Sequence, residues 1–377
     1  MRTSIVITSY NYDRYVRAAI DGALAQSHPA TQVVVVDDGS TDGSPEVVRS
    51  YADRAVVVCK TNGGQASAFN AGLAACDGQL VCFMDSDDLI YPHTMARAVA
   101  AVGPGHAKVH LPLDIIDADG RATGDVMHRH DLAAGDVRPA VLAGGPAAYN
   151  WPCTSGNAWT RTFLDRVMPM PEAEYRIGPD VYLAALAPLF GEVARLDAPG
   201  GAYRIHGHNN TFKEPFDARV ASAVRFWDHC FGVLASWCDR LGLKCRPADF
   251  AAHSFWHRTA TAAREIEARV PPGSTIVLAG EEQWVTDEIG GRRVVPMLQR
   301  GGQYWGPPAD DGQAIEELDR DRAAGATHLV VPWWATWWRE HYDGFWRHLL
   351  ERHELVFEND RLTLFRLIPS PAGRAHA

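Results

Sequence analysis

Apolar residues in the first hundred positions alternate between short continuous runs and runs at helical spacing. The continuous runs have the length of strands, and Val33–Val36 has the character of a strand buried on both faces. Strands that alternate with helices pair in parallel through crossover helices, so an α/β sandwich is predicted here. The predicted strands lie at 4–8, 33–37, 55–59 and 80–84, and the predicted helices at 13–26, 44–51, 65–76 and 94–102.

The pattern changes further along the chain. Additional strands are predicted at 109–113 and 115–116, and a helix is predicted at 180–190. From 215 to 270 the apolar residues recur at helical spacing, and Gly242 with Pro247 marks a break between two helices. We therefore expect a helical connector in this region.

A second α/β segment follows Pro271-Pro272-Gly273, and residues 370–377 are expected to form a loose tail. The tryptophans of 333–338 are expected to pack a domain interface rather than to stack on sugar rings. The predicted strands of this segment lie at 275–279, 292–296, 328–331, 355–357 and 362–367, and its helices at 313–324 and 336–352. Because 377 residues exceed the usual size of one core, we expect an α/β domain at 1–213, the connector at 214–270 and a smaller C-terminal α/β domain at 271–377.

Composition and charge exclude several classes of protein. The chain has 46% hydrophobic and 22% charged residues, which is typical of a folded protein. Its net charge is -10 and it has no basic run, so nucleic acid is not expected as a partner. The densest apolar stretch, 329–338, is too short to span a bilayer, which leaves only peripheral membrane association open. The seven cysteines form no CxxC pair and the N-terminus shows no signal peptide, so we expect free thiols and a cytoplasmic location.

Polar residues follow each of the first four predicted strands. Open parallel sheets bind ligands beyond the carboxyl ends of their strands, so these residues are the leading candidates for function. Each motif alone has a simpler interpretation as a turn or a helix cap, although backbone amides at a helix start also attract phosphate. The four motifs are Thr8-Ser9-Tyr10-Asn11, Asp37-Asp38-Gly39-Ser40, Asn62-Gly63-Gly64-Gln65 and Asp85-Ser86-Asp87-Asp88.

The last of these motifs is the hardest to explain structurally. Three carboxylates within four residues, at the end of an apolar strand, repel one another unless a cation or hydrogen-bond donors compensate them. Carboxylate and diphosphate oxygens are the ligands that Mg²⁺ and Mn²⁺ prefer. The sequence therefore predicts a divalent cation, Mn²⁺ or Mg²⁺, near Asp85 and Asp87.

Taken together, the motifs resemble those of the inverting glycosyltransferases of family two, which have the GT-A fold. The resemblance covers roughly the first 200 residues. It rests on Ile7–Asn11, Val36–Asp42, Asn62–Gly72, Phe83–Asp88, Gly178-Pro179-Asp180 and Tyr203–Asn210, in the order of the family.

The resemblance implies a role for each motif. Thr8, Tyr10 and Asp38 would hold the nucleobase of a nucleotide sugar, Tyr10 by stacking and Asp38 by accepting a hydrogen bond from a uracil-type N–H. Asp180 is similar to the catalytic base of the family, and Asp87 and His206 resemble its metal ligands. The remaining positions implied to bind the nucleotide sugar are Asn62, Gly64, Gln65, Asp85, Ser86 and Ser155.

These expectations define a metal-dependent inverting glycosyltransferase with a nucleoside-diphosphate sugar as donor, most simply a UDP-sugar. Its acceptor would be a hydroxyl of a glycan or glycoconjugate, as in polysaccharide biosynthesis. Two alternatives stay open, a nucleotidyltransferase and an inactive module that binds sugar nucleotides. The transferred sugar, the acceptor, the linkage and the oligomeric state do not follow from the sequence.

Overall fold

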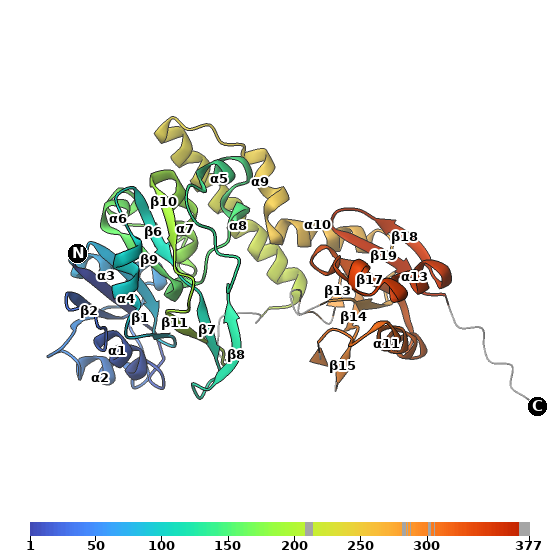
Figure 1. Ribbon diagram of the computed structural model, residues 1–377, viewed down its shortest axis with the longest axis horizontal. Helices are drawn as coiled ribbons and strands as arrows, with labels where there is room; N and C mark the ends of the chain where they lie inside the picture. The colour runs from blue at the N-terminus through green and yellow to red at the C-terminus, as the bar shows by residue number, and fades with distance from the viewer. Residues whose placement is uncertain are drawn as a thin grey trace, which may run out of the picture. The chain divides into compact units, whose positions relative to one another are not determined.

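The computed structural model describes residues 1–207, 214–280, 284, 286, 288–300, 303–304 and 306–368. The chain divides into two compact units, Met1–Asn209 with Asp228–His253, and Asn210–Trp227 with Ser254–Ala377 (Figure 1). The end of the predicted motif, from His208 to Asn210, and the predicted tail at 370–377 lie outside the described residues.

A seven-stranded sheet forms the centre of the first unit. Its strands are, in spatial order, β10 (Glu192–Arg195), β6 (His106–His110), β9 (Asn157–Thr160), β4 (Leu80–Asp85), β1 (Thr3–Ser9), β2 (Thr31–Asp37) and β3 (Val56–Cys59). The pairs β4·β1, β1·β2 and β2·β3 are parallel, as the alternation of strands and helices predicts. β9 instead runs antiparallel to both of its neighbours, β4 and β6.

Helices cover both faces of this sheet. The core on one face combines apolar residues of the strands with residues of α1 (Val16–Leu24), α2 (Ser44–Arg49) and α4 (Thr94–Ala101). On the other face, α3 (Gln65–Ala75) packs so closely on β1 and β2 that a Cβ at Gly72 would lie 2.2 Å from Val6 Cγ1. α6 (Arg161–Val167) and α7 (Pro179–Phe190) also contact β6. The α/β sandwich is thereby confirmed.

A second, four-stranded sheet lies in the same unit, with the order β5 (Leu89–Ile90), β11 (Gly201–Arg204), β7 (Leu113–Ile116) and β8 (Ala122–Met127). The predicted strand 109–113 is wrong, because β6 ends at His110 and β7 starts at Leu113. Pro112 lies between them and has no backbone N–H for a strand ladder, which explains the interruption. The unit also contains α5 (Arg138–Gly144) and two short 3₁₀ helices, η1 (Pro146–Ala148) and η2 (Thr154–Gly156).

The predicted helical connector contains three helices, α8 (Phe216–Leu241), α9 (Pro247–His253) and α10 (Phe255–Glu267). The predicted break is confirmed, since α8 ends just before Gly242, which has a φ of +68°, and α9 begins at Pro247. These helices are shared between the two units, with α9 in the first and α10 in the second.

The second unit is built on a six-stranded sheet with the order β13 (Glu288–Ile289), β14 (Arg292–Pro296), β12 (Thr275–Leu278), β17 (Ala326–Pro332), β19 (Leu362–Arg366) and β18 (Glu354–Glu358). The strands β14, β12 and β17 are parallel, and β19 and β18 continue the sheet in antiparallel pairing. A small hairpin of β15 (Gln299–Arg300) and β16 (Gln303–Tyr304) follows β14.

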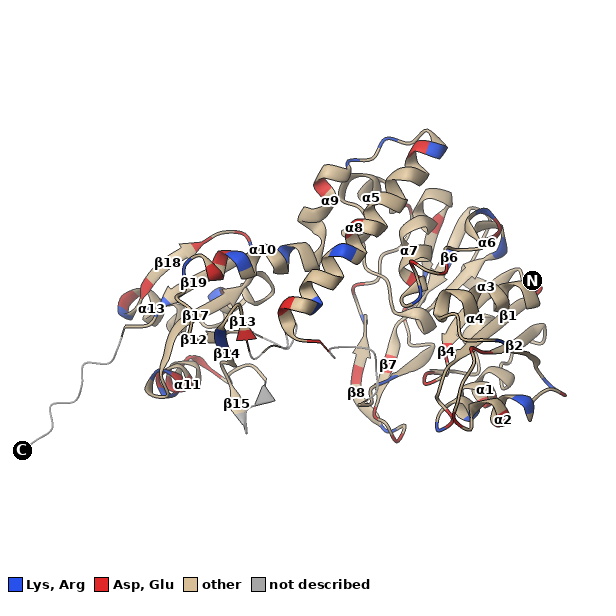
Figure 2. Ribbon diagram, turned by 180° about the vertical axis from the view of Figure 1, so that it is seen from behind, with Lys and Arg blue, Asp and Glu red and all other residues tan. Residues whose placement is uncertain are grey.

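Helices of this unit differ in part from the prediction. α11 (Asp311–Ala323) agrees with it, and this helix carries both acidic and basic residues (Figure 2). The predicted helix 336–352 is divided into α12 (Trp338–His341) and α13 (Asp343–Arg352), because the backbone of Tyr342 leaves the helical region at φ -115° and ψ 64°. A short 3₁₀ helix, η3 (Trp333–Ala335), precedes them.

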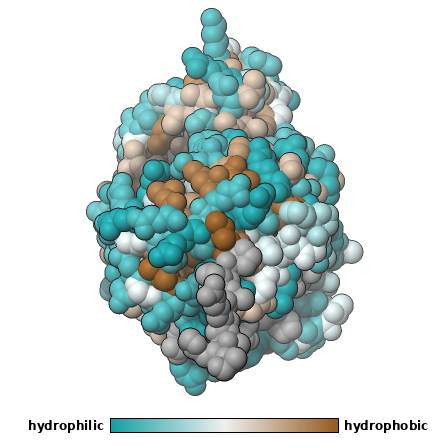
Figure 3. Space-filling model, turned by 90° about the vertical axis from the view of Figure 1, so that its right-hand side faces the viewer, coloured by the Kyte–Doolittle hydropathy of each residue, from teal (hydrophilic) through white to brown (hydrophobic). Residues whose placement is uncertain are grey.

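The tryptophans near η3 pack inside the second unit. Trp333 and Trp334 contact the rings of Trp284 and Phe255, and Trp338 is 1% exposed. These residues pack as expected, but within the second unit rather than at an interface between domains. Trp337 is 42% exposed. On one face of the molecule, apolar side chains lie among hydrophilic ones (Figure 3). Within the described residues, no helix is both long and apolar enough to cross a bilayer.

Candidate active site

The polar motifs converge at the carboxyl ends of the central strands. Ser9 at the end of β1 pairs with Asp37 at the end of β2, and Thr8 pairs with Asp85 at the end of β4. The backbone N–H of Asp38 donates to the carbonyl of Ser9 at 2.9 Å. Parallel pairing therefore places three of the predicted motifs at one edge of the sheet.

Asp38 holds the remaining motif, Asn62–Gln65, at the same edge of the sheet by hydrogen bonds. Its buried carboxylate accepts hydrogen bonds from the backbone N–H of Gly63 at 3.0 Å and of Gly64 at 2.7 Å. The ammonium of Lys60 donates to it at 2.6 Å. Asn62 donates to the backbone carbonyl of Asp38 at 3.0 Å. Asp38 thus orders the loop that begins α3, in addition to lying where a nucleobase contact is expected.

At the start of α3, the backbone of Arg176 lies very close to Gly64. Its φ is +90°, and a Cβ on it would lie 2.4 Å from Arg176 Cγ and 2.8 Å from the Arg176 carbonyl oxygen. That carbonyl accepts the N–H of Gln65 at 2.9 Å, and the Arg176 guanidinium donates to Asn62. Only glycine fits this position without displacing the segment that precedes α7.

Several buried polar atoms at this edge find no hydrogen-bond partner among the residues that the structure describes. They are the hydroxyls of Thr8, Ser9 and Ser86 and the Oδ1 atom of Asp37. Tyr10, just beyond β1, is 47% exposed. Because buried polar groups are normally hydrogen-bonded, these atoms indicate a site that a polar ligand completes.

Gln65 joins the acidic motif to the start of α7. Its side-chain amide donates to Asp85 Oδ1 at 2.6 Å, and its Oε1 accepts the N–H of Gly178 at 3.3 Å. Burial raises the pKa of Asp85 well above its usual value, and the charges of Asp87, Asp88 and Asp180 raise it further. The predicted base Asp180 and the acidic motif therefore belong to one electrostatic cluster.

Asp180 lies in the first turn of α7, where it is partly buried. The N-cap of this helix is Gly178, in the left-handed conformation with φ 76°, so Asp180 is not the capping residue. Burial raises the pKa of Asp180 to about 6, while nearby backbone N–H groups and Lys108 act in the opposite direction. A carboxyl group with this pKa is ionised at neutral pH and is poised to take up a proton.

Asp87 and His206 form a close pair. Asp87 Oδ2 lies 3.0 Å from His206 Nε2, and both side chains are largely buried. The imidazole stacks on Tyr15 at 5.0 Å between centroids and meets Tyr12 edge-on at 5.5 Å. The tyrosines, three residues apart after β1, thus hold His206 beside the acidic motif.

Hydrogen bonds of Asp88 and Ser155 hold the acidic motif in position. The Ser155 hydroxyl donates to Asp88 Oδ2 at 2.6 Å and accepts the N–H of Asp85 at 3.1 Å. Asp88 Oδ1 accepts the backbone N–H of Arg204 at 3.0 Å, and the Arg204 guanidinium donates to the carbonyl of Asp87 at 2.7 Å. Burial and the charge of Asp87 raise the pKa of Asp88 to about 8.

Sequence reasoning missed Lys60 and Arg176, which belong to no recognisable motif. It gave no role to Arg204, although this residue lies within the motif 203–210. Within the described residues, no group of three or more His, Cys, Asp or Glu side chains is arranged to hold a metal ion. Asp87 and His206 alone offer a two-residue ligand set, and a bound ion would need further oxygens from water or a diphosphate. All seven cysteines are described and are free thiols, as expected.

Comparison with known proteins defines the class. The chain aligns with the crystal structure of Staphylococcus aureus TarS residues 1–349 in complex with UDP, with a TM-score of 0.50 and 20% identity over 72% of this chain and 76% of that one. The fold of the chain is therefore of the GT-A type. Residues 4–132 match the family model described as Glycosyl transferase family 2. This N-terminal part of the chain is therefore similar to glycosyltransferase family 2.

Sequence relatives agree with this assignment. An uncharacterized glycosyltransferase of Nostoc is 36% identical over 215 residues, which make up 56% of this chain and 66% of that protein. The succinoglycan biosynthesis protein ExoO of Rhizobium meliloti is 34% identical over 122 residues, 32% of this chain and 35% of that protein. The chain thus spans less than two thirds of the length of these relatives.

Proposed function

We propose that this protein transfers a sugar, with inversion, from a nucleoside-diphosphate donor to a hydroxyl group of a glycan or glycoconjugate. The preferred donor is a UDP-sugar, and the reaction depends on Mn²⁺ or Mg²⁺. The names of two relatives support the classes of donor and acceptor, since the TarS structure contains UDP and ExoO is a succinoglycan biosynthesis protein.

One observation carries the proposal. Gln65 bridges Asp85, at the end of β4, and Gly178, two residues before Asp180. The bridge brings a partly buried carboxylate on α7 beside the acidic strand end, where displacement at an anomeric carbon needs both charge stabilisation and a base.

The nucleotide would lie along the ends of β1 and β2. Tyr10 is exposed enough to stack on a base, and the unpartnered Thr8 hydroxyl lies at the same edge. Asp38 would present a uracil N–H with an acceptor while it keeps the Gly63–Gly64 loop in place. Asn62, Gly64 and Gln65, at the N-terminus of α3, would face the diphosphate, which helix N-termini favour.

Asp85 and Ser86 would border the ribose and the diphosphate, and Ser155 would act by holding Asp85 and Asp88 in position. Asp87 and His206 fit a divalent cation, since a carboxylate and an imidazole lie 3.0 Å apart within a cluster of negative charge. A bound cation would supply positive charge to the leaving diphosphate.

Asp180 would remove the proton from the acceptor hydroxyl as that oxygen attacks the anomeric carbon. The donor's glycosidic bond to the diphosphate breaks as the new bond forms. A single base and a single displacement produce inversion at the anomeric carbon.

The experiment is a screen of UDP-, GDP-, CDP- and dTDP-sugars by thermal shift with and without Mn²⁺, followed by a release assay with glycan acceptors. We expect a UDP-sugar to raise the melting temperature and UDP to be released faster when an acceptor is present. Release of pyrophosphate would identify a nucleotidyltransferase instead. Binding without any release would identify an inactive sugar-nucleotide module.

A further inference from the structure

Arg204 is a buried arginine at the end of β11, and the proposed reaction gives it no role. It is 5% exposed, and it pairs with Ile116 of the parallel strand β7. The N–H of the next residue, Ile205, continues this ladder by donating to the carbonyl of Ile116 at 2.8 Å. His206 therefore follows directly from a fixed strand end, two residues after the arginine. Because burying a guanidinium is costly unless it is hydrogen-bonded, its contacts indicate what it does.

The side chain of Arg204 holds two separate segments of backbone. Its Nε donates to the carbonyl of Asp87 at 2.7 Å. One terminal nitrogen donates to the carbonyl of Asp117 at 3.2 Å, in the turn between β7 and β8. The donors of a guanidinium point in fixed directions within one plane, so Arg204 fixes the position of Asp87 relative to that turn.

The backbone of Arg204 holds the next residue of the acidic motif. Its N–H donates to Asp88 Oδ1 at 3.0 Å, while Asp88 Oδ2 accepts the Ser155 hydroxyl at 2.6 Å. The first half of the motif is attached separately, since the N–H of Ser86 donates to the carbonyl of Thr8 at 3.2 Å. Arg204 thus helps to fix the second half of the motif, which contains the predicted metal ligand.

Arg204 also approaches the ring on which His206 stacks. The central carbon of its guanidinium lies 4.8 Å from the centroid of the Tyr15 ring, and the imidazole of His206 stacks on the same ring at 5.0 Å between centroids. A guanidinium over an aromatic face is attracted by the charge distribution of the ring. The arginine therefore contacts both the backbone of Asp87 and the ring that supports His206, the two residues whose side chains lie 3.0 Å apart.

We propose that Arg204 is a positioning residue, which holds Asp87 and His206 together as a ligand pair for a divalent cation. This inference rests on the proposed function, because the metal requirement belongs to it. Asp87 and His206 are 119 positions apart in the sequence, so their separation depends on the contacts that join their segments. Arg204 supplies contacts of this kind through its side chain, its backbone N–H and the Tyr15 ring.

The first test is the binding of Mn²⁺ alone, measured by the loss of the electron paramagnetic resonance signal of the free ion. Arg204→Met removes the guanidinium donors and should weaken Mn²⁺ binding by roughly 10–100-fold, as is usual for residues that orient metal ligands. Arg161→Met is the matched control, because Arg161 donates to the carbonyls of Cys76 at 2.7 Å and Gly78 at 3.2 Å, before the start of β4 and away from Asp85 at its end. This control should bind Mn²⁺ like the wild type. Equal Mn²⁺ affinity of Arg204→Met and the wild type would overturn the inference.

Arg204→Lys keeps the decision open to experiment if Arg204→Met does not fold. A lysine keeps the charge, but its single nitrogen does not reproduce the fork that reaches both Asp87 and Asp117. Mn²⁺ affinity should therefore still fall, by roughly tenfold. Wild-type affinity for Mn²⁺ in Arg204→Lys would contradict the positioning role.

A second measurement distinguishes a positioning residue from one that only stabilises the fold. The affinity for UDP, or for the nucleoside diphosphate that the thermal-shift screen selects in its place, is measured with Mn²⁺ and with excess chelator, beside the melting temperature. Arg204→Lys should lose affinity in Mn²⁺ and keep it in chelator, whereas Arg161→Met should lower the melting temperature alone. A lower melting temperature of Arg204→Lys with an unchanged ratio of the two affinities would reduce Arg204 to a structural residue. If the wild type itself binds no Mn²⁺, the metal requirement of the proposed function is wrong, and the inference is overturned with it.

Discussion

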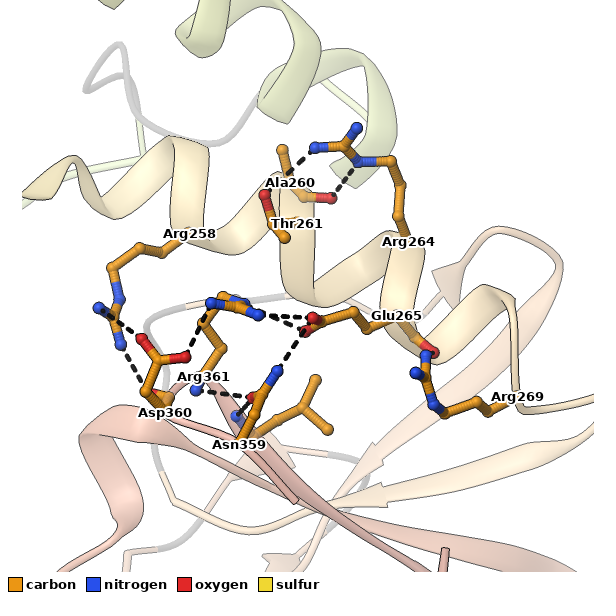
Figure 4. Close-up of polar contacts among 10 residues, drawn as sticks. Arg258, Ala260, Thr261, Arg264, Glu265, Arg269, Asn359, Asp360 and Arg361 are labelled. Carbon is orange, nitrogen blue, oxygen red and sulfur yellow. Dashed lines mark hydrogen bonds and ion pairs between the residues drawn. The ribbon is translucent and has the colours of Figure 1, made fainter. Parts of the chain in front are cut away.

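Acidic side chains behave differently at the strand ends of the first unit and beside α10 in the second. At the strand ends, burial raises the pKa of both Asp85 and Asp88, and the charge of Asp87 raises both further. Beside α10, Glu265 accepts two hydrogen bonds from the Arg361 guanidinium, at 2.7 and 3.2 Å, and one from Asn359 at 3.0 Å (Figure 4). The first group lacks a full set of compensating partners, whereas the second has one.

The difference distinguishes carboxylates that form a ligand-binding site from a carboxylate that stabilises the fold. Folding gains little from carboxylates that repel one another, so the strand-end cluster is best explained by a ligand that completes it. The contacts of Glu265 join α10 to the turn between β18 and β19, and Arg258 adds an ion pair with Asp360 at 3.5 Å on the same turn. Removing a carboxylate should therefore affect chemistry in one region and stability in the other.

The largest effect is expected for Asp180→Asn. The amide keeps the shape of the side chain but cannot take up a proton, so kcat should fall by roughly 10²–10⁴-fold while donor affinity changes little. In the wild type, kcat should fall as the pH drops below about 6, because Asp180 becomes protonated there. Nucleoside-diphosphate release and donor binding measure both effects, with the exposed Asp53→Asn as control. Wild-type turnover in Asp180→Asn would move the base to another residue.

Asp87→Asn should have the next largest effect. It replaces a charged ligand by a neutral one beside His206, so donor affinity in the presence of Mn²⁺ should fall by tenfold or more, about 1.4 kcal/mol. Calorimetric titration of the donor, with Mn²⁺ and with excess chelator, measures this. Undiminished affinity of the wild type in chelator, together with full activity, would show that the carboxylates do not serve a metal.

Local patterns were sufficient to predict much of the fold and part of the site. The continuous apolar run of β2 and the polar residues after β1, β2 and β4 are short-range features that sequence displays directly. β9 was not predicted, because its four residues become a strand only by pairing with β4 and β6. Short segments of this kind depend on tertiary context more than on propensity.

Contacts between residues far apart in the sequence are the part of the site that could not be predicted. Lys60 meets Asp38 across 22 positions, and Arg176 meets Asn62 across 114 positions. Lys108 is a further example, since it occupies a strand position where an apolar residue is usual and its environment comes from Trp159, Tyr149 and α7. The spacing of residues in a single sequence does not indicate which distant residues form such pairs.

A smaller effect, on UDP binding, is expected for Tyr10→Ala. This variant tests whether the exposed ring of Tyr10 contacts the nucleobase. Tyr10→Ala should weaken UDP binding by about 1–3 kcal/mol if the ring stacks on the base. Competition by UDP, GDP, CDP and dTDP against a labelled donor measures the base preference. A tenfold preference for GDP over UDP would contradict the proposed role of Asp38 and Tyr10.

The smallest effect is expected for Glu265→Gln, which tests the other side of the comparison. The amide keeps the size of the side chain but loses the charge that Arg361 pairs with, in a place where Glu265 is only 16% exposed. Hydrogen bonds to charged groups contribute more than neutral ones, so the second unit should lose roughly 1–2 kcal/mol of stability. Glu354→Gln is the matched control, because its pair with Arg366 is 53–55% exposed and such pairs contribute little. Urea unfolding followed by tryptophan fluorescence measures stability, and nucleoside-diphosphate release measures turnover. Two outcomes would contradict the distinction between a carboxylate that stabilises the fold and carboxylates that form a ligand-binding site. One is equal stability of the two variants, and the other is a large loss of turnover in Glu265→Gln without unfolding.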